Sequence, residues 1–145
     1  MINGKICVSV CAETAAELVG QIKRAGESAD VVEIRFDCLT DAELRKTKFK
    51  LPEFKRTFLV TFRPREQGGK RDVSVYERLK FWEAVFWNNR QKEFLADTEF
   101  DIKEMLNAAD DRTIVSYHDF VGEVEKLPFS YEALTSTGRN IIKIA

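Results

Sequence analysis

The sequence is poor in the residues that build metal sites. A single histidine, His118, and three cysteines, Cys7, Cys11 and Cys38, occur among 145 residues, and no two cysteines have the Cys-x-x-Cys spacing. No zinc or other metal site is therefore predicted. An odd cysteine count without that spacing is typical of a reducing compartment, so we expect three reduced, mostly buried thiols in a cytoplasmic protein.

Long apolar runs and a strong charge imbalance are absent as well. No segment approaches the roughly 20 apolar residues that cross a bilayer, and the run ICVSV (6–10) is too short for the core of a signal peptide. The net charge of -1, without a basic run, argues against nucleic acid or a membrane surface as partner. A chain that is 44% hydrophobic and 32% charged has the composition of a folded domain, and its length suits one domain.

Strand-like and helix-like segments alternate along the chain, with short connections between them. The predicted strands span 5–11, 30–37, 56–63, 92–100, 112–120 and 140–145, and the predicted helices span 13–26, 40–47, 74–89, 101–109 and 130–138. Thr40 and a Ser74/Glu77 capping box mark two helix starts, and Gly26 marks a helix end. Such alternation predicts an α/β fold with a parallel sheet and helices outside it.

Polar residues recur near the carboxyl ends of these strands, two positions apart, where side chains point to the same face. Strands of a sheet buried on both faces should be almost entirely apolar, so each polar residue is costly unless it is paired or used. Parallel α/β folds build their active sites at this edge. The set therefore predicts an active site, and it comprises Ser9, Glu33, Arg35, Thr61, Arg63, Asp97, Glu99, Ser116, His118 and Lys143.

Lys143 lies in the final segment, IIKIA (141–145). An apolar setting disfavours the ammonium form, and the neutral amine that results can attack a ketone or aldehyde to form an imine. The alternative is a structural lysine paired with a carboxylate such as Glu33 or Asp97.

His118 and the two arginines suit the same chemistry. Histidine titrates near neutral pH and can move protons, although His118 could also be a core histidine, and Glu33 could orient it. Arg35 and Arg63 could bind hydroxyl or carboxylate oxygens of a substrate, or could form structural salt bridges, in the case of Arg35 with Glu33 or Asp37. The residues alone indicate a Schiff-base enzyme for a small oxygenated carbonyl compound, with elimination and aldol cleavage both open.

The loop after the third predicted strand contains two adjacent glycines, Gly68 and Gly69, which permit unusual backbone angles. It lacks the spacing of a phosphate-binding loop. It could close over the site or be a plain connection.

Four segments together, EIRFD (33–37), TFRPREQGG (61–69), SYHDF (116–120) and IIKIA (141–145), resemble type I 3-dehydroquinate dehydratase in the same order over nearly the whole chain. The resemblance implies a (β/α)8 TIM barrel that dehydrates 3-dehydroquinate to 3-dehydroshikimate in the shikimate pathway. It implies no metal and no cofactor, and a homodimer is common in this family.

The resemblance also implies residue roles. Lys143 matches the lysine that forms the imine, and His118 matches the histidine that assists imine formation and moves the protons of the elimination. The substrate-site residues implied by the same match are Glu33 and Arg35, which contact substrate hydroxyls and support the histidine, Arg63 in the substrate site, and Ser9 at the pocket floor. One position differs from the family. The residue before the glycine pair is often glutamate in type I 3-dehydroquinate dehydratases, whereas here it is Gln67, with Glu66 one place earlier.

A TIM barrel typically needs about 250 residues, so residues 1–145 are expected to form a single, incomplete barrel domain truncated at its carboxyl end, with two unpaired edge strands. The family's carboxylate-binding arginine and last-loop serine and glutamine would lie beyond residue 145. Three explanations of the short chain are left open. It could be a fragment of a longer dehydratase or of a fusion with shikimate dehydrogenase, it could be a shortened gene product, or a partner could complete the barrel. Two other functions are left open as well: an aldolase-like class I Schiff-base enzyme, and an inactive fragment.

Overall fold

The computed structural model describes residues 4–47, 51–53, 55–103, 105–106, 112–118, 127–135 and 141–144. Within these residues one parallel sheet contains six strands, which pair in the order of the chain. The strands are β1 (Cys7–Val10), β2 (Val31–Arg35), β3 (Thr57–Thr61), β4 (Phe94–Glu99), β5 (Thr113–Tyr117) and β6 (Ile141–Ile144). The described helices are α1 (Ala15–Ala25), α2 (Asp41–Lys46), α3 (Val75–Asn88) and α4 (Leu127–Thr135).

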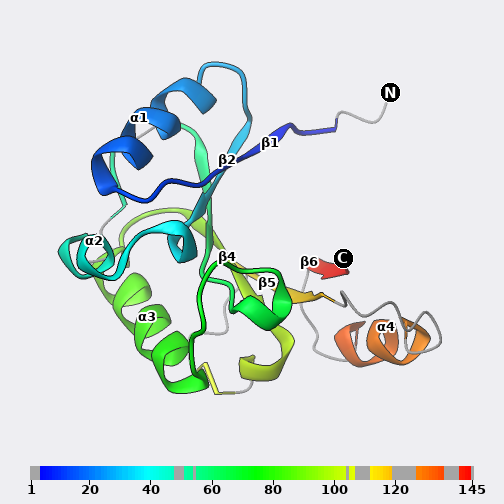
Figure 1. Cartoon of the computed structure of the whole chain (residues 1–145). Helices are drawn as coiled ribbons and strands as arrows, with labels where there is room; N and C mark the ends of the chain where they lie inside the picture. Colours follow the sequence, from blue (N-terminus) through cyan, green and yellow to red (C-terminus); the bar gives the residue numbers. More distant parts are fainter. Residues whose placement is uncertain are drawn as a thin grey trace.

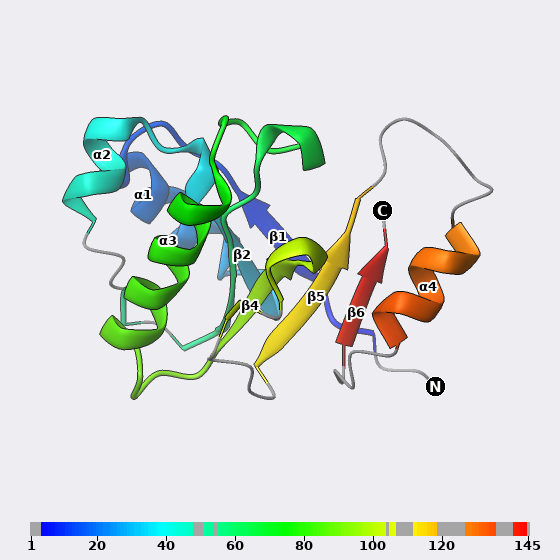
Figure 2. The same cartoon turned by 90° about the horizontal axis from the view of Figure 1, so that it is seen from below.

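The sheet is curled, and its helices lie outside the curve. Helices α1, α2 and α3 gather on one side, while α4 stands beside β6 at the far end (Figures 1 and 2). This arrangement confirms the predicted α/β fold with a parallel sheet. None of the described helices combines the length and the apolar character that a membrane span requires.

The two faces of the sheet differ in chemistry because side chains alternate along each strand. One face carries apolar residues such as Val32, Val60 and Ala96, all fully buried in the core that also contains Trp82 of α3. The opposite face carries the polar residues of the predicted site. Burial of the apolar face against the helices thus fixes which face the polar residues occupy.

The helix-end signals of the sequence are confirmed. The Ser74 hydroxyl accepts a hydrogen bond from the Glu77 backbone N–H, and the Glu77 carboxylate accepts one from the Ser74 backbone N–H, which completes the capping box of α3. The Thr40 hydroxyl caps α2 by accepting a hydrogen bond from the Glu43 backbone N–H, and Gly26 ends α1.

The helix predicted over 101–109 is wrong at its start. A single 3-10 turn, Phe100–Ile102, follows β4 instead. The Asp101 carboxylate does not cap a helix here, because it accepts two hydrogen bonds from Arg78 of α3, at 2.9 and 2.5 Å. Residues 107–109 lie outside the described residues. Helix α4 starts at Leu127, three residues before the predicted helix, whose predicted end at Gly138 is likewise outside the described residues.

The prediction of three reduced, mostly buried thiols is also wrong. Cys11 and Cys38 form a disulfide with a Cα–Cα distance of 5.4 Å, and Cys7 is free and exposed. The pairing follows from topology. Because β1 and β2 are adjacent parallel strands, the residues that follow them lie side by side at the same edge, within the reach of a disulfide. The 27 residues between the cysteines conceal this proximity in the sequence.

Candidate functional site

The six predicted site residues lie on one face of the sheet near the carboxyl ends of its strands. Ser9 is on β1 in register with Glu33 of β2, and Lys143 is on β6 in register with Ser116 of β5. Arg35 ends β2, whereas Arg63 follows β3 by two residues and His118 directly follows β5. Ser9 is exposed, since β1 pairs on one side only within the described residues.

The centre of the site is an ion cluster built on β4. Asp97 Oδ2 accepts a hydrogen bond from Arg63 Nη2 at 2.6 Å and another from Lys143 Nζ at 3.1 Å. The Asp97 side chain is fully buried and Arg63 nearly so. Burial by itself raises the pKa of the Asp97 carboxyl, but the charges of Arg63 and Lys143 outweigh this and hold that pKa below its ordinary value. Asp97 is therefore a carboxylate at neutral pH.

Lys143 does not have the apolar setting that its neighbours in sequence predict. Its side chain is 36% exposed, and its ammonium is paired with Asp97. The reason is that β6 is an edge strand within the described sheet, and that the interior face of β4 presents a carboxylate to it. The salt bridge with Asp97 is one of the two pairings that the sequence left open.

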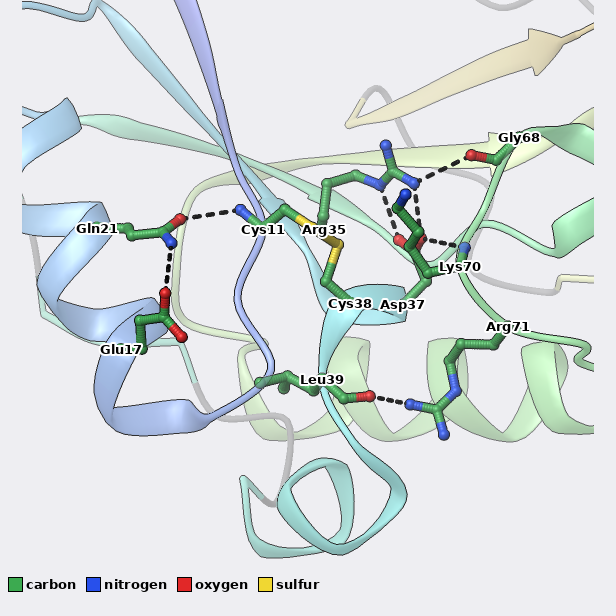
Figure 3. Close-up of a disulfide and its surroundings, with 10 residues drawn as sticks. All are labelled: Cys11, Glu17, Gln21, Arg35, Asp37, Cys38, Leu39, Gly68, Lys70 and Arg71. Carbon is green, nitrogen blue, oxygen red and sulfur yellow. Dashed lines mark hydrogen bonds and ion pairs between the residues drawn. A yellow bond between two sulfur atoms is a disulfide. The ribbon is translucent and has the colours of Figure 1, made fainter.

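Glu33 and Arg35 of β2 have different partners. Glu33 Oε1 accepts a hydrogen bond from the Thr61 hydroxyl of β3 at 2.7 Å. Arg35 instead donates from Nε and Nη2 to the two oxygens of Asp37, at 2.8 and 2.6 Å (Figure 3). The side-chain hydrogen bond to Asp37 is the main cause of a raised pKa for Arg35. The proposed support of His118 by Glu33 stays a prediction.

His118 is the residue predicted to move protons, and it is buried, with 7% of its surface exposed. Burial, followed by the positive charges of Arg63 and Lys143, lowers the pKa of His118 to about 4. The imidazole is therefore neutral at pH 7. A neutral imidazole can accept a proton and return it, which is what acid–base catalysis requires.

Glu99 lies two residues beyond Asp97 on β4, on the same face of the sheet. Its side chain is fully buried, and burial raises the pKa of Glu99 to about 8, helped by the negative charge of Asp97. Arg78 Nη1 donates a hydrogen bond to it over 3.4 Å. Two carboxyl groups on one strand thus take opposite protonation states at pH 7, because Asp97 has two close cations and Glu99 has a longer contact to Arg78.

The loop after β3 is compact. It contains a 3-10 turn, Arg65–Gln67, followed by Gly68 at φ 82°, a backbone angle that favours glycine. A side chain at Gly69 would place its Cβ 1.9 Å from the Arg63 carbonyl oxygen, so only glycine fits there. Gln67 is half-buried and Glu66 exposed.

Three residues that organise this site, Asp97, Thr61 and Asp37, received no individual role in the prediction from the sequence. Asp97 and Thr61 belonged to the recurrent polar pattern, and Asp37 was considered only as an arginine partner. The available signal was a carboxylate within a strand that should be buried on both faces. The sequence left Lys143 as an open pairing for Asp97 and did not indicate Arg63, because these partners are 46 and 34 residues away.

Comparison with known proteins identifies the family of this chain. The family model for type I 3-dehydroquinase matches residues 6–145. The chain belongs to the type I 3-dehydroquinase family. Among curated relatives, the 3-dehydroquinate dehydratase of Pyrococcus abyssi is 28% identical over 96% of this chain and 65% of its own length. That of Thermococcus gammatolerans is 30% identical over 93% of this chain and 63% of its own length.

Solved structures resemble this type I 3-dehydroquinase chain in fold. The 3-dehydroquinate dehydratase of Enterococcus faecalis has a TM-score of 0.75 at 19% identity and covers 98% of this chain. The type I enzyme of Clostridium difficile, solved with covalently modified comenic acid, has a TM-score of 0.72 at 20% identity and covers 97% of this chain. The chain spans 65% and 62% of those two chains, which is less than two thirds. Its curled sheet is an incomplete barrel of the TIM type.

Proposed function

We propose that the chain carries the imine-forming part of a 3-dehydroquinate dehydratase, a hydro-lyase that converts 3-dehydroquinate to 3-dehydroshikimate through a Schiff base on Lys143. The observation that carries the proposal is the ion cluster of Lys143 with the buried Asp97, on the same face as His118, in a member of this family. No metal or other cofactor is needed for the steps below.

The first step is imine formation. The free amine of Lys143 attacks the ketone carbon of the substrate, and the hydroxyl of the resulting carbinolamine takes up the proton that the lysine ammonium released and leaves as water. The nitrogen keeps one hydrogen and carries a positive charge as an iminium. The lysine ammonium must lose a proton before the attack, so substrate entry has to open its 3.1 Å contact with Asp97.

The second step is the elimination. The iminium withdraws electrons from the adjacent carbon and makes its C–H bond acidic. His118 accepts that proton, since its imidazole is neutral at pH 7. The electron pair forms the new C=C bond as the hydroxyl on the next carbon departs, and the proton held by His118 leaves with that hydroxyl as water. Hydrolysis of the imine then frees the product and Lys143.

Asp97 has an electrostatic role in both steps. The ammonium of the resting state and the iminium of the intermediate are both cations on the same nitrogen. A buried carboxylate in reach of that nitrogen stabilises the iminium, which is the electron sink of the reaction. The neighbouring Arg63 keeps Asp97 ionised while the lysine is neutral.

The remaining predicted residues suit a polar, hydroxylated substrate. Arg35 is 17% exposed, enough to reach a ligand while one side of its guanidinium is held by Asp37. Glu33 and Ser9 lie in register on neighbouring strands and can contact hydroxyl groups. Arg63 is more deeply placed, and its proposed action on substrate goes mainly through Asp97.

The biological setting of the chain is also part of the proposal. The substrate and product place the reaction in the shikimate pathway of aromatic amino acid synthesis. A homodimer, and a neighbouring or fused shikimate dehydrogenase, rest on the resemblance alone. A cytoplasmic location also stays a prediction, and disulfides such as Cys11–Cys38 are uncommon in reducing compartments.

Covalent capture tests the function directly. The protein is incubated with 3-dehydroquinate and borohydride, and its intact mass and peptide map are measured. We expect a reduced adduct on Lys143, lost in Lys143→Ala and retained in the matched control Lys80→Ala, whose lysine is exposed on α3. A folded sample that gains no adduct would contradict catalysis by this chain, as the inactive-fragment alternative predicts.

Product analysis separates dehydration from aldol cleavage, which could use the same lysine. We expect an enone to form without loss of carbon, and its formation is monitored by ultraviolet absorbance. Carbon–carbon cleavage products would favour the aldolase-like alternative.

A further inference from the structure

Asp37 occupies the 3-10 turn, Phe36–Cys38, that directly follows β2. Its side chain is fully buried, yet it accepts three hydrogen bonds. Two come from Arg35, and the third comes from the backbone N–H of Lys70 at 3.1 Å. Figure 3 shows this carboxylate between the Arg35 guanidinium and the chain at Lys70. One carboxylate therefore joins β2 to the loop after β3.

The two bonds to Arg35 fix the plane of its guanidinium. A bidentate pair of this kind sets direction as well as energy, because both N–H groups must point along the same edge of the carboxylate. Arg35 Nη2 also reaches the Gly68 carbonyl oxygen at 3.5 Å. The turn after β2 and the loop together thus orient the Arg35 guanidinium through Nε and Nη2. Its Nη1 is the nitrogen left to donate to a substrate oxygen.

The loop held by Asp37 is in turn packed against Arg63. Gly69 donates to the Pro64 carbonyl oxygen at 2.9 Å, and its missing side chain lets the chain lie against the Arg63 carbonyl. Arg63 binds Asp97 of the ion cluster. A continuous path of contacts therefore runs from Asp37 through the loop to the centre of the site.

Covalent and polar contacts anchor the turn that bears Asp37. Cys38, the next residue, forms a disulfide with Cys11, which directly follows β1. Arg71, beyond the loop, donates to the Leu39 carbonyl oxygen and forms an ion pair with Asp41. The turn is fixed on both sides, so Asp37 can act as a rigid acceptor for the loop.

We propose that Asp37 is a positioning residue that holds Arg35 and the loop 65–70 as one unit and so aims the guanidinium at an oxygen of the substrate. The proposal rests on the proposed function for its substrate. In this proposal the loop 65–70 is already held against β2 before substrate binds, and it does not act as a lid that closes over the site.

The test compares Asp37→Asn with Asp72→Asn, a matched control whose carboxylate belongs to the same loop region, is exposed and pairs with Arg65. Asparagine keeps the size of Asp37 but presents an NH₂ group to the Arg35 donors. In Asp37→Asn we expect hydrogen exchange of the 65–70 peptide to accelerate at least tenfold. We also expect the 3-dehydroquinate concentration for half-maximal borohydride trapping to rise about tenfold, with the maximal trapping rate changed less than threefold, since Lys143 and His118 are untouched.

A second variant covers the case in which Asp37→Asn does not fold. Arg35→Lys keeps the charge but cannot make two parallel bonds. It should raise the half-maximal concentration while the 65–70 peptide stays protected through Lys70. An unchanged half-maximal concentration in a folded variant of either kind, or unchanged exchange in Asp37→Asn, overturns the proposal. If the unaltered chain traps no substrate, the proposed function fails and the substrate part of this proposal fails with it, while exchange alone still decides whether Asp37 holds the loop.

Discussion

Lys143 Nζ lies 3.1 Å from Asp97 Oδ2, and the two residues come from β6 and β4, 46 residues apart in the chain. Strand β5 separates them in the sheet, so the contact crosses the curved interior face. The same oxygen binds Arg63. A lysine with a buried counter-ion differs from the lysine in apolar surroundings that the sequence predicts, and in the proposed mechanism it makes Asp97 the residue that controls the imine.

Asp97→Asn should slow borohydride trapping at Lys143 by about a hundredfold, because the buried charge that stabilises the iminium is lost. It should also destabilise the fold by about 3–5 kcal/mol, because Arg63 stays buried without its carboxylate. Denaturant unfolding and trapping kinetics measure the two effects. Glu83→Gln, which removes an exposed ion pair with Lys80, is the control and should change neither appreciably. Trapping at the unaltered rate in a folded Asp97→Asn would refute the electrostatic role.

His118 can be titrated by NMR without assignment of competing signals, because it is the only histidine of the chain. We expect its imidazole resonances to move with a midpoint near pH 4. Because its folded pKa lies below the unfolded value of 6.5, stability from this group is complete above pH 6.5 and is lost as the pH falls through 4. A midpoint near 6.5 would mean that the ring is solvated and not held beside Arg63 and Lys143.

Glu99 has the opposite pH dependence. Its folded pKa, about 8, lies above the ordinary 4.5, so its contribution to stability is complete below pH 4.5 and is lost as the pH rises through 8. Between pH 7.5 and 8, where His118 is almost entirely neutral in both the folded and the unfolded state, the free energy of unfolding should fall with pH. Glu99→Gln should flatten this slope, whereas the exposed Glu66→Gln should not. Equal slopes in both variants would show that Glu99 is ionised in the folded state.

The Cys11–Cys38 disulfide should stabilise the chain chiefly by restricting its unfolded state. For cysteines 27 residues apart, the loop-entropy relation gives about 3–4 kcal/mol. Cys38→Ser should lower the free energy of unfolding by this amount, and a reductant should have the same effect on the unaltered chain. Cys7→Ser changes a free, exposed thiol and is the control. If mass analysis under native conditions finds three free thiols in the folded protein, the disulfide is refuted.

The periodicity of the sequence determined the secondary structure and the sheet. Alternation of apolar strands with capped helices requires parallel strands, and the capping box at Ser74 locates the start of α3 from local hydrogen bonds alone. The two-residue spacing likewise placed Glu33 and Arg35 on one face of β2. These features depend on interactions within a few residues, so the sequence contains them.

Only the tertiary structure decided which groups meet across strands. The pairing of Asp97 with Lys143, of Cys11 with Cys38 and of Asp37 with Lys70 depends on strand order and register. The 3-10 turn after β4 also has this origin, because Asp101 bonds to Arg78 on a different element. Protonation states follow the same rule. Asp97 and Glu99 are two residues apart on one strand, and they differ in charge because burial and distant cations act on them unequally.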